Sequence, residues 1–565
     1  MSPFIRPASI RHADRLLATS IFCFLLALYS ASMSTQPDVL DGEVEFQSTS
    51  ALMRTGSLAL GGTPEGDAIA RAGFNCHPGA GEQSDKMFSW FGVGQAYVAA
   101  PFYLAGAALA RVFPNIEAAN SLGTHMGVPR SEYFAHLFVG WRNPLLGALT
   151  AAMIAISARR LGSTRKSAWL AGMSYGLCTF AWPQARSTFN SVQATFFLFL
   201  AVHSLLAISE AYHRFRRPER STLLLAGLGM GMAFLTRMVM APALVVIGIA
   251  LLWVLLRAKQ HKIPQASWSD LIWILAPALA CLGIFLATNN ARFGSPWETG
   301  YGDTVTWDNF FGFPPQRGLA GLLISPSRGL FYLAPGAVLG LITLWLNLRR
   351  GDLRLPLLIA GLSAAILLPP ALTVGWHGAV GYGPRYALPL LPLLWLGVGP
   401  GLDLLQRRKT WRWFSAALLL FGLSTSLPGV LVDTSTHFDL AHQAALLRYP
   451  EMPGVTEEDR AAARFERIQW DLDFAAPWSH WRILRHRVAE LPEEFPAGEI
   501  FNLEGPHKDA LLKPAHERER GFRHLAWVDF RERLGGHLWA PLLLGVALII
   551  AGLVNLSRGF DADRA

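Results

Sequence analysis

Long apolar runs, separated by short polar segments rich in arginine and lysine, recur along most of the chain. Runs of about 17 to 25 apolar residues are long enough to cross a hydrocarbon layer roughly 30 Å thick as helices. They extend from residues 16–34 to residues 538–556, and we expect about twelve spanning helices in all. The pattern predicts an all-α polytopic membrane protein.

The basic clusters between these runs indicate which loops face the cytoplasm, where lysine and arginine are enriched. Arginines precede the first run, so we expect the chain to start inside and to emerge at residue 35. A cleaved signal peptide is the alternative interpretation of this run. Residues 91–112 contradict the charge rule if they span the membrane. Since Pro101 interrupts this stretch, we expect it to lie along the outer interface as a juxtamembrane helix.

The same pattern divides the chain into three parts. Residues 1–430 are predicted to form a transmembrane module, with a first outer loop over about residues 35–132. Residues 431–536 are charged and polar, and we expect a soluble segment outside the membrane. Residues 537–565 then supply a last spanning helix and a cytoplasmic tail.

Composition excludes an ordinary cytosolic enzyme. Of 565 residues, 52% are hydrophobic and 16% charged, with a mean hydropathy of +0.30, whereas soluble domains carry about 25% charged residues. The net charge of +9 comes mostly from the short clusters between apolar runs, so it indicates topology and not nucleic-acid binding. The four cysteines show neither a disulfide framework nor zinc-site spacing.

Carboxylates are concentrated just after the first apolar run. Asp41 and Glu43 are the candidates for catalysis, with Asp38 third. A carboxylate beside the bilayer can act as a general base toward a hydroxyl, or can bind a divalent cation. A solvated acidic loop, or the first turn of a helix, is the alternative.

Five arginines lie at or near the outer ends of predicted helices, where short loops disfavour basic residues. Guanidinium groups are planar and always charged, which suits a phosphate or diphosphate near the outer leaflet. For any single arginine, a lipid headgroup or a helix-end carbonyl is an alternative partner. Together they predict an anion site. The five are Arg186, Arg237, Arg292, Arg328 and Arg385.

The predicted outer loops are rich in glycine, proline and aromatic residues. Aromatic rings stack against the apolar faces of sugars, although they also favour the membrane interface for amphipathic reasons. The candidate substrate-binding residues are Trp297, Tyr301, Trp376, His377 and Tyr382. The glycines at residues 227–231 lie within an apolar run, and we expect them to serve helix packing and not phosphate binding.

Over roughly residues 10–430, the sequence resembles the bacterial membrane glycosyltransferases of the C-type superfamily, which include the family 39 protein mannosyltransferases and the aminoarabinose transferases. The resemblance rests on five short motifs. They are Asp41-Gly42-Glu43, Phe91-Gly92-Val93-Gly94, Arg292-Phe293-Gly294-Ser295-Pro296, Arg328-Gly329-Leu330-Phe331 and Gly383-Pro384-Arg385-Tyr386.

This resemblance implies transfer of a sugar, with inversion, from a polyprenyl-phosphate carrier to a glycolipid, polysaccharide or protein at the outer face of a bacterial plasma membrane. Asp41 takes the role of general base, with Glu43 in reserve. The segment 187–191 lacks a carboxylate that relatives often carry, and Asp303 or Asp308 could substitute. No cofactor is certain, a divalent cation is allowed, and membrane lipids but no nucleic acid are expected as partners.

Two other functions remain open at this point. A transporter or flippase of a lipid-linked sugar would also gather arginines and aromatics around a phosphate, but it would usually show internal repeats. An O-antigen ligase or polymerase would use a large outer loop, and the segment after Val430 is long enough for one.

Overall fold

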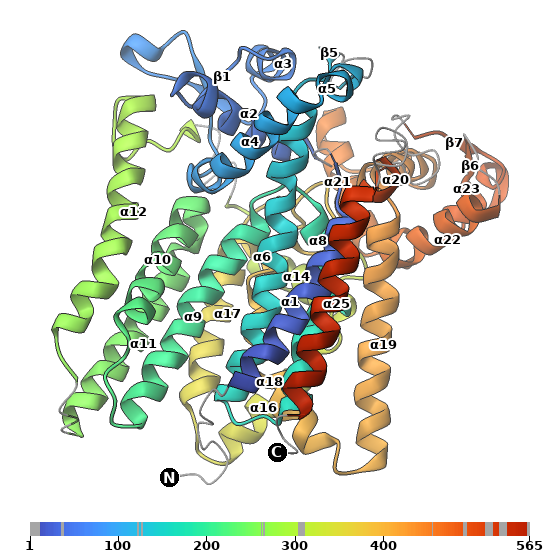
Figure 1. Ribbon diagram of the computed structural model, residues 1–565. Helices are drawn as coiled ribbons and strands as arrows, with labels where there is room; N and C mark the ends of the chain where they lie inside the picture. The colour runs from blue at the N-terminus through green and yellow to red at the C-terminus, as the bar shows by residue number, and fades with distance from the viewer. Residues whose placement is uncertain are drawn as a thin grey trace.

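The chain folds into an upright bundle of helices with smaller elements across one end (Figure 1). The structure is a computed structural model. It describes residues 12–35, 39–120, 124–125, 128–261, 263, 266–302, 311–454, 456–489, 494–514, 524–529 and 539–561.

Within this part of the chain, eight helical segments are long and apolar enough to cross a membrane. They are α1 (His12–Ser32), α6 (Tyr133–Arg160), α9 (Ser191–His213), η2 with α11 (Met238–Gln260), α12 (Ser269–Phe293), α17 (Arg354–Ala371), α19 (Lys409–Leu431) and α25 (Trp539–Asp561). Shorter apolar helices stand among them: α10 (Arg220–Thr236), α16 (Ala337–Arg349) and α18 (Leu390–Leu405). The predicted all-α polytopic fold is confirmed.

Two apolar runs that are long enough for one continuous helix are each divided into two helices in the structure. The run over residues 168–182 divides into α7 (Arg165–Leu177) and α8 (Ala181–Arg186), where the Thr179 hydroxyl accepts a hydrogen bond from the Ala181 amide at 3.0 Å. The run over residues 331–348 divides at Pro335 into α15 (Leu330–Leu333) and α16. A further short helix, α14 (Pro315–Ile324), precedes α15.

The first outer loop covers one end of the bundle. It contains α2 (Leu40–Thr55), α3 (Pro64–Ala72), α4 (Gly94–Val112) and α5 (Pro114–Asn120). Three antiparallel strands connect them in the order β1 (Ala59–Leu60), β3 (Met87–Ser89) and β2 (Cys76–Pro78), and β4 (Thr124–His125) pairs with β5 (Val128–Pro129). The start of α1 and the end of α25 lie at the opposite end (Figure 1).

The helix α4 corresponds to the predicted juxtamembrane helix. It lies across the end of the bundle beside α2, and packs on α6 and α10 (Figure 1). Gly92 and Gly94 allow this approach, since a Cβ at Gly94 would lie 2.8 Å from the backbone nitrogen of Thr236. This position across the end of the bundle agrees with the expected juxtamembrane helix.

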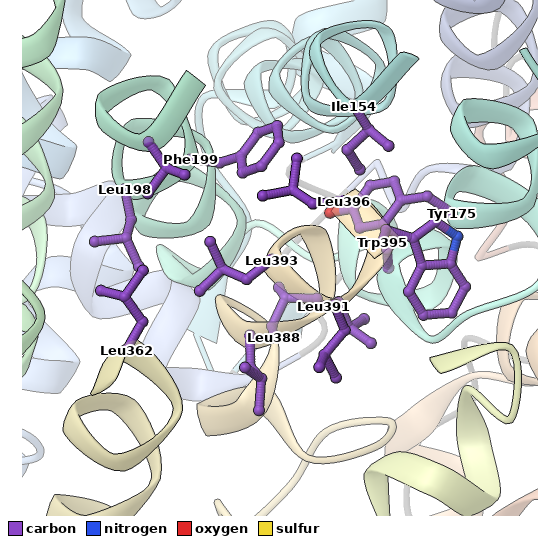
Figure 2. Close-up of a cluster of buried hydrophobic side chains, with 14 of the residues drawn as sticks. Ile154, Tyr175, Leu198, Phe199, Leu362, Leu388, Leu391, Leu393, Trp395 and Leu396 are labelled. Atoms are coloured by element: carbon purple, nitrogen blue, oxygen red, sulfur yellow. The ribbon is translucent and has the colours of Figure 1, made fainter. Parts of the chain in front are cut away.

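The helix α18 is buried within the bundle, and side chains of neighbouring helices pack around it (Figure 2). Trp395 is fully buried, and its indole nitrogen donates a hydrogen bond to Ser174 Oγ at 3.1 Å. Burying a side chain of this size removes about 150–250 Å² of mostly apolar surface. The residues around α18 are Ile154 of α6, Tyr175 of α7, Leu198 and Phe199 of α9 and Leu362 of α17.

The glycines of α10 are packing positions. A Cβ at Gly229 would lie 2.7 Å from the carbonyl oxygen of Phe197 in α9, and a Cβ at Gly231 would lie 2.7 Å from Cβ of Cys281 in α12. The absence of side chains therefore lets α10 lie close to both neighbours. The helix-packing interpretation of residues 227–231 is confirmed.

The segment after α19 has a hydrophobic cluster of its own. Its elements are α20 (Thr434–Arg448), α21 (Glu457–Gln469), η5 (Leu472–Phe474), α22 (Ala476–Ala489), β6 (Phe495–Pro496), α23 (Ala497–Phe501), η6 (Gly505–His507) and β7 (Leu511–Leu512). The segment lies at the same end of the bundle as the first outer loop (Figure 1). Both loops therefore cover the end at which the candidate site lies.

Candidate active site

Helix α2 begins with the acidic residues that follow the first span. Asp41 and Glu43 lie in its first turn, where negative charge is favourable toward the positive end of the helix dipole. Residues four positions apart share a helix face, so Asp41 and Glu45 project together, whereas Glu43 points elsewhere. The helix thus separates its carboxylates into two groups.

Asp41 forms an ion pair with an arginine that is distant in the sequence. Nη1 of Arg385 lies 2.9 Å from Oδ2 of Asp41, and Asn75 Nδ2 donates a hydrogen bond to Oδ1 at 2.7 Å. Arg385 lies in the 3₁₀ turn η4 (Arg385–Ala387), just before α18. The structure therefore joins two of the predicted site residues across 344 positions of sequence.

Arg237 and Arg385 face the same two rings. The guanidinium of Arg385 lies 4.7 Å from the ring centroid of Phe189 and 5.4 Å from that of Tyr386. The guanidinium of Arg237 lies 5.7 Å and 5.3 Å from the same centroids, and donates a hydrogen bond to Ser191 Oγ at 3.0 Å. Two cations held together favour an anion between or beside them.

Glu45 lies in the same charged environment. Its side chain is 2% exposed, and neither carboxylate oxygen has a hydrogen-bond partner among the described residues. Burial raises its pKa to about 8, against the opposing effect of the nearby arginines, foremost Arg142. Arg142 of α6 is also buried and donates to the carbonyl oxygen of Thr188 at 2.7 Å, while its Nη1 has no hydrogen-bond partner in the part of the chain that the structure describes.

Sequence reasoning missed Glu45 and Arg142. The signal for Glu45 was the spacing of four residues from Asp41, which places both carboxylates on one face of a helix. Arg142 lies inside a long apolar run, and a charged residue within a spanning helix is by itself an indication of function.

Arg292 approaches this group from α12. It donates hydrogen bonds to the carbonyl oxygen of Ser89 at 2.9 Å and to Asn289 Oδ1 at 2.8 Å. Arg292 and Glu45 both line a small cavity, together with Ser48 of α2 and Gln95 of α4. The cavity thus brings the end of α12 to the face of α2 that carries Asp41 and Glu45.

Glu43 is bound into the fold. It is 1% exposed, accepts a hydrogen bond from Gln47 at 2.7 Å, and lies 3.2 Å from Nε2 of His136 in α6. These contacts tie α2 to α6 on the side away from Arg385. Its reserve role in catalysis is not supported by this geometry and remains only a prediction.

Arg186 and Arg328 hold the segment after α19. Arg186 donates hydrogen bonds to the carbonyl oxygen of Val430 at 2.9 Å and to Oδ1 of Asp433 at 3.1 Å. Arg328 donates to Gln469 Oε1 at 3.1 Å and to the carbonyl oxygens of Ala379, Gly381 and Gly383. The donors of both side chains are used by the protein itself, as are those of Arg292. Of the five predicted arginines, Arg237 and Arg385 are therefore the better placed to bind an anion.

Among the aromatic candidates, Tyr301 lies at the site. Its ring stacks on Trp90 at a centroid distance of 5.3 Å. Burial raises its pKa to about 12, and Arg237, Tyr386, Glu45 and Asp41 all interact with it electrostatically. Trp297, in contrast, is 75% exposed.

The other three candidates pack under the segment after α19. Trp376 is fully buried near Trp470, at a centroid distance of 6.2 Å. The ring of His377 lies edge-on to Phe465 at 4.6 Å, and burial lowers its pKa to about 3, so it is neutral at pH 7. Tyr382 is buried, and its hydroxyl donates to the carbonyl oxygen of Thr425. Their predicted contact with substrate therefore remains a prediction.

Metal ligands do not converge in the described residues, where no group of three or more His, Cys, Asp or Glu side chains could hold an ion. Asp38, Asp303 and Asp308 lie outside those residues.

One protein-family model matches part of the chain. Residues 96–293, from α4 to the end of α12, match the family model of the dolichyl-phosphate-mannose-protein mannosyltransferases. No curated protein matches the chain.

Two solved structures are similar to the chain. The crystal structure of ArnT from Cupriavidus metallidurans in the apo state has 15% sequence identity and a TM-score of 0.41, over 83% of this chain and 79% of that chain. The structure of the same protein bound to undecaprenyl phosphate has 14% identity and a TM-score of 0.39, over 85% and 81%. The family match over residues 96–293 agrees with the resemblance to membrane glycosyltransferases that the loops predicted.

Proposed function

We propose that the protein transfers a sugar from a polyprenyl-phosphate carrier to an acceptor at the outer face of a bacterial plasma membrane, with inversion at the anomeric carbon. The observation that supports this best is the contact between Asp41 and Arg385, beside a second, partly buried arginine, Arg237. A carboxylate next to paired guanidinium groups provides both a base for a hydroxyl and a binding site for a phosphate.

The donor phosphate takes the place of the Asp41 carboxylate at Arg385. An anion between Arg385 and Arg237 neutralises both cations, and it releases Asp41 from its ion pair. Asp41 then accepts the proton of the acceptor hydroxyl as that oxygen attacks the anomeric carbon. The arginines stabilise the negative charge that develops on the leaving phosphate.

The remaining site residues bind the sugar and close the site. Tyr301, stacked on Trp90, offers an aromatic face to a hexose or pentose. Residues 1–430 provide the catalytic module, residues 431–536 an outer segment that faces the acceptor, and residues 537–565 the last helix and tail. The acceptor is a glycolipid, a polysaccharide or a protein.

The first prediction tests the base. Asp41→Asn keeps the shape of the side chain but cannot accept a proton at neutral pH, so we expect transfer to fall by about 10²- to 10⁴-fold. The measurement uses the full-length protein in proteoliposomes, a panel of undecaprenyl-phosphate-linked radiolabelled hexoses and pentoses, and an envelope extract that supplies acceptors. Release of undecaprenyl phosphate is followed by thin-layer chromatography.

The matched control is Asp85→Asn, which removes an exposed carboxylate from the same outer loop. It should transfer at the rate of the unchanged protein. Full activity of Asp41→Asn would reject Asp41 as the base, and lack of turnover with every donor would reject the proposed function.

A further inference from the structure

Glu45 has a buried carboxyl group without a hydrogen-bond partner among the residues that the structure describes. It is 2% exposed, and no donor reaches either oxygen among the described residues. A buried carboxylate without hydrogen bonds is costly, whereas the protonated form loses much less by burial. Burial therefore favours a neutral Glu45, and this effect exceeds the opposing effect of the nearby arginines.

The charged groups that face Glu45 come from every side. Asp41 lies on its own helix, Arg142 on α6, Arg237 at the end of α10 and Arg385 on η4, and Arg292 of α12 lines the same cavity. Apart from Asp41, these groups are all cationic. The carboxyl group thus lies where the site concentrates positive charge, which is the phosphate end.

We propose that Glu45 is the general acid of the transfer and donates its proton to the phosphate oxygen that leaves the sugar. This inference rests on the proposed function, in which Asp41 is the only residue that accepts or donates a proton.

The reaction balances with two proton transfers. The acceptor oxygen forms its bond to the anomeric carbon, and its proton passes to the Asp41 carboxylate. The bond between the anomeric carbon and the phosphate oxygen breaks, and its electron pair remains on that oxygen, which takes the proton of Glu45. The carrier leaves as a phosphate monoanion.

The protonation states of Asp41 and Glu45 must return to their starting values after each transfer. Asp41 then carries a proton and Glu45 carries a charge, and they are one helical turn apart on the same face of α2. Transfer of the proton from Asp41 to Glu45, directly or through a water molecule, restores the starting state. No metal or other reactant is required for this balance.

The test is the pH dependence of turnover in the full-length protein, with whichever undecaprenyl-phosphate sugar of the panel it uses. An acid must be protonated, so kcat should fall as the pH rises through about 8. Glu45→Gln has no proton to donate: its rate at pH 7 should be lower by about 10²-fold or more, and the fall at high pH should be absent. Glu45→Asp should retain the fall and recover part of the rate.

The control is Glu65→Gln, a buried carboxyl in the same loop whose oxygens accept hydrogen bonds from Ser131. It should keep the pH profile of the unchanged protein even if it lowers stability. Difference infrared spectroscopy gives a second readout, since a protonated carboxyl band present at pH 7 should be missing in Glu45→Gln.

Each outcome decides one point. A rate that rises through pH 8 and loses this rise in Glu45→Gln would make Glu45 a base and overturn the proposal. An unchanged rate and profile in Glu45→Gln would overturn it while leaving Asp41 and the proposed function intact. Lack of turnover with every donor would overturn both.

Discussion

At the scale of single residues, the site is defined by how its charges are paired. Asp41 and Arg385 were predicted as site residues from their loops, and the structure brings them to 2.9 Å. Arg186 and Arg328 were predicted on the same grounds, but each donates a hydrogen bond to a side chain more than 100 residues away, Asp433 and Gln469 respectively. These hydrogen bonds could not be predicted from the sequence. The charge pattern shows that an arginine lies near the outer end of a helix, but it does not show which group the arginine binds.

A substitution at Arg385 tests the anion site. Arg385→Ala removes a charged donor from the proposed phosphate position, which should weaken binding of undecaprenyl phosphate by about 10- to 100-fold, given about 1.5–3 kcal/mol for a hydrogen bond to a charged group. Isothermal titration calorimetry with the detergent-solubilised protein measures the affinity.

Arg328→Met is the comparison for this measurement. Because Arg328 bonds three backbone carbonyls and Gln469, its loss should lower the melting temperature more than the affinity. Equal affinities for Arg385→Ala and the unchanged protein would remove the phosphate role of Arg385.

At the scale of elements, hydropathy predicted the spanning helices because the bilayer imposes one length on all of them. The charge rule predicted that residues 91–112 do not span the membrane. The helix α4, which they form, lies across the end of the bundle. The interruptions between α7 and α8 and between α15 and α16 were not predicted, since an apolar run has the same hydropathy whether its helix is continuous or broken. Glu45 was missed for a related reason: its type is common in solvated loops, and only the helix α2 shows that it is buried.

The packing of α10 makes a prediction at this scale. Gly229→Leu places a side chain against the backbone of α9 and should destabilise the protein by about 1–3 kcal/mol or more, as overpacking does. Thermal unfolding followed by differential scanning fluorimetry measures the loss.

The control lies on α12, where a Cβ at Gly283 would meet no atom within 4 Å. Gly283→Ala should be neutral, or stabilising by up to about 1 kcal/mol, because alanine is the better helix former. Equal melting temperatures for the two variants would contradict the close packing of α10.

At the scale of the whole molecule, the first outer loop and the segment after α19 lie at one end, and the basic clusters of the short loops lie at the other (Figure 1). Arg186 and Arg328 join that segment to the bundle. The site therefore lies beneath two loops that are distant in sequence.

Cysteine labelling in intact cells tests this orientation. In a cysteine-free background, Asn115→Cys on α5 should react with a membrane-impermeant maleimide, since residue 115 is exposed and lies in the outer loop. Arg216→Cys, in the exposed basic turn after α9, should react only after the membrane is permeabilised. The reverse pattern would overturn the topology.

The ion pair between Asp41 and Arg385 has a consequence for selectivity. A site that supplies its own counterion has little attraction for sulfate or orthophosphate from the surrounding medium, because such an ion must first compete with a tethered carboxylate. A lipid-borne phosphate is held at the bilayer surface by its hydrocarbon chain, and its high local concentration gives it the advantage that a freely diffusing anion lacks. If the protein uses a lipid-linked sugar as proposed, the site thus stays accessible to that carrier in the presence of free anions.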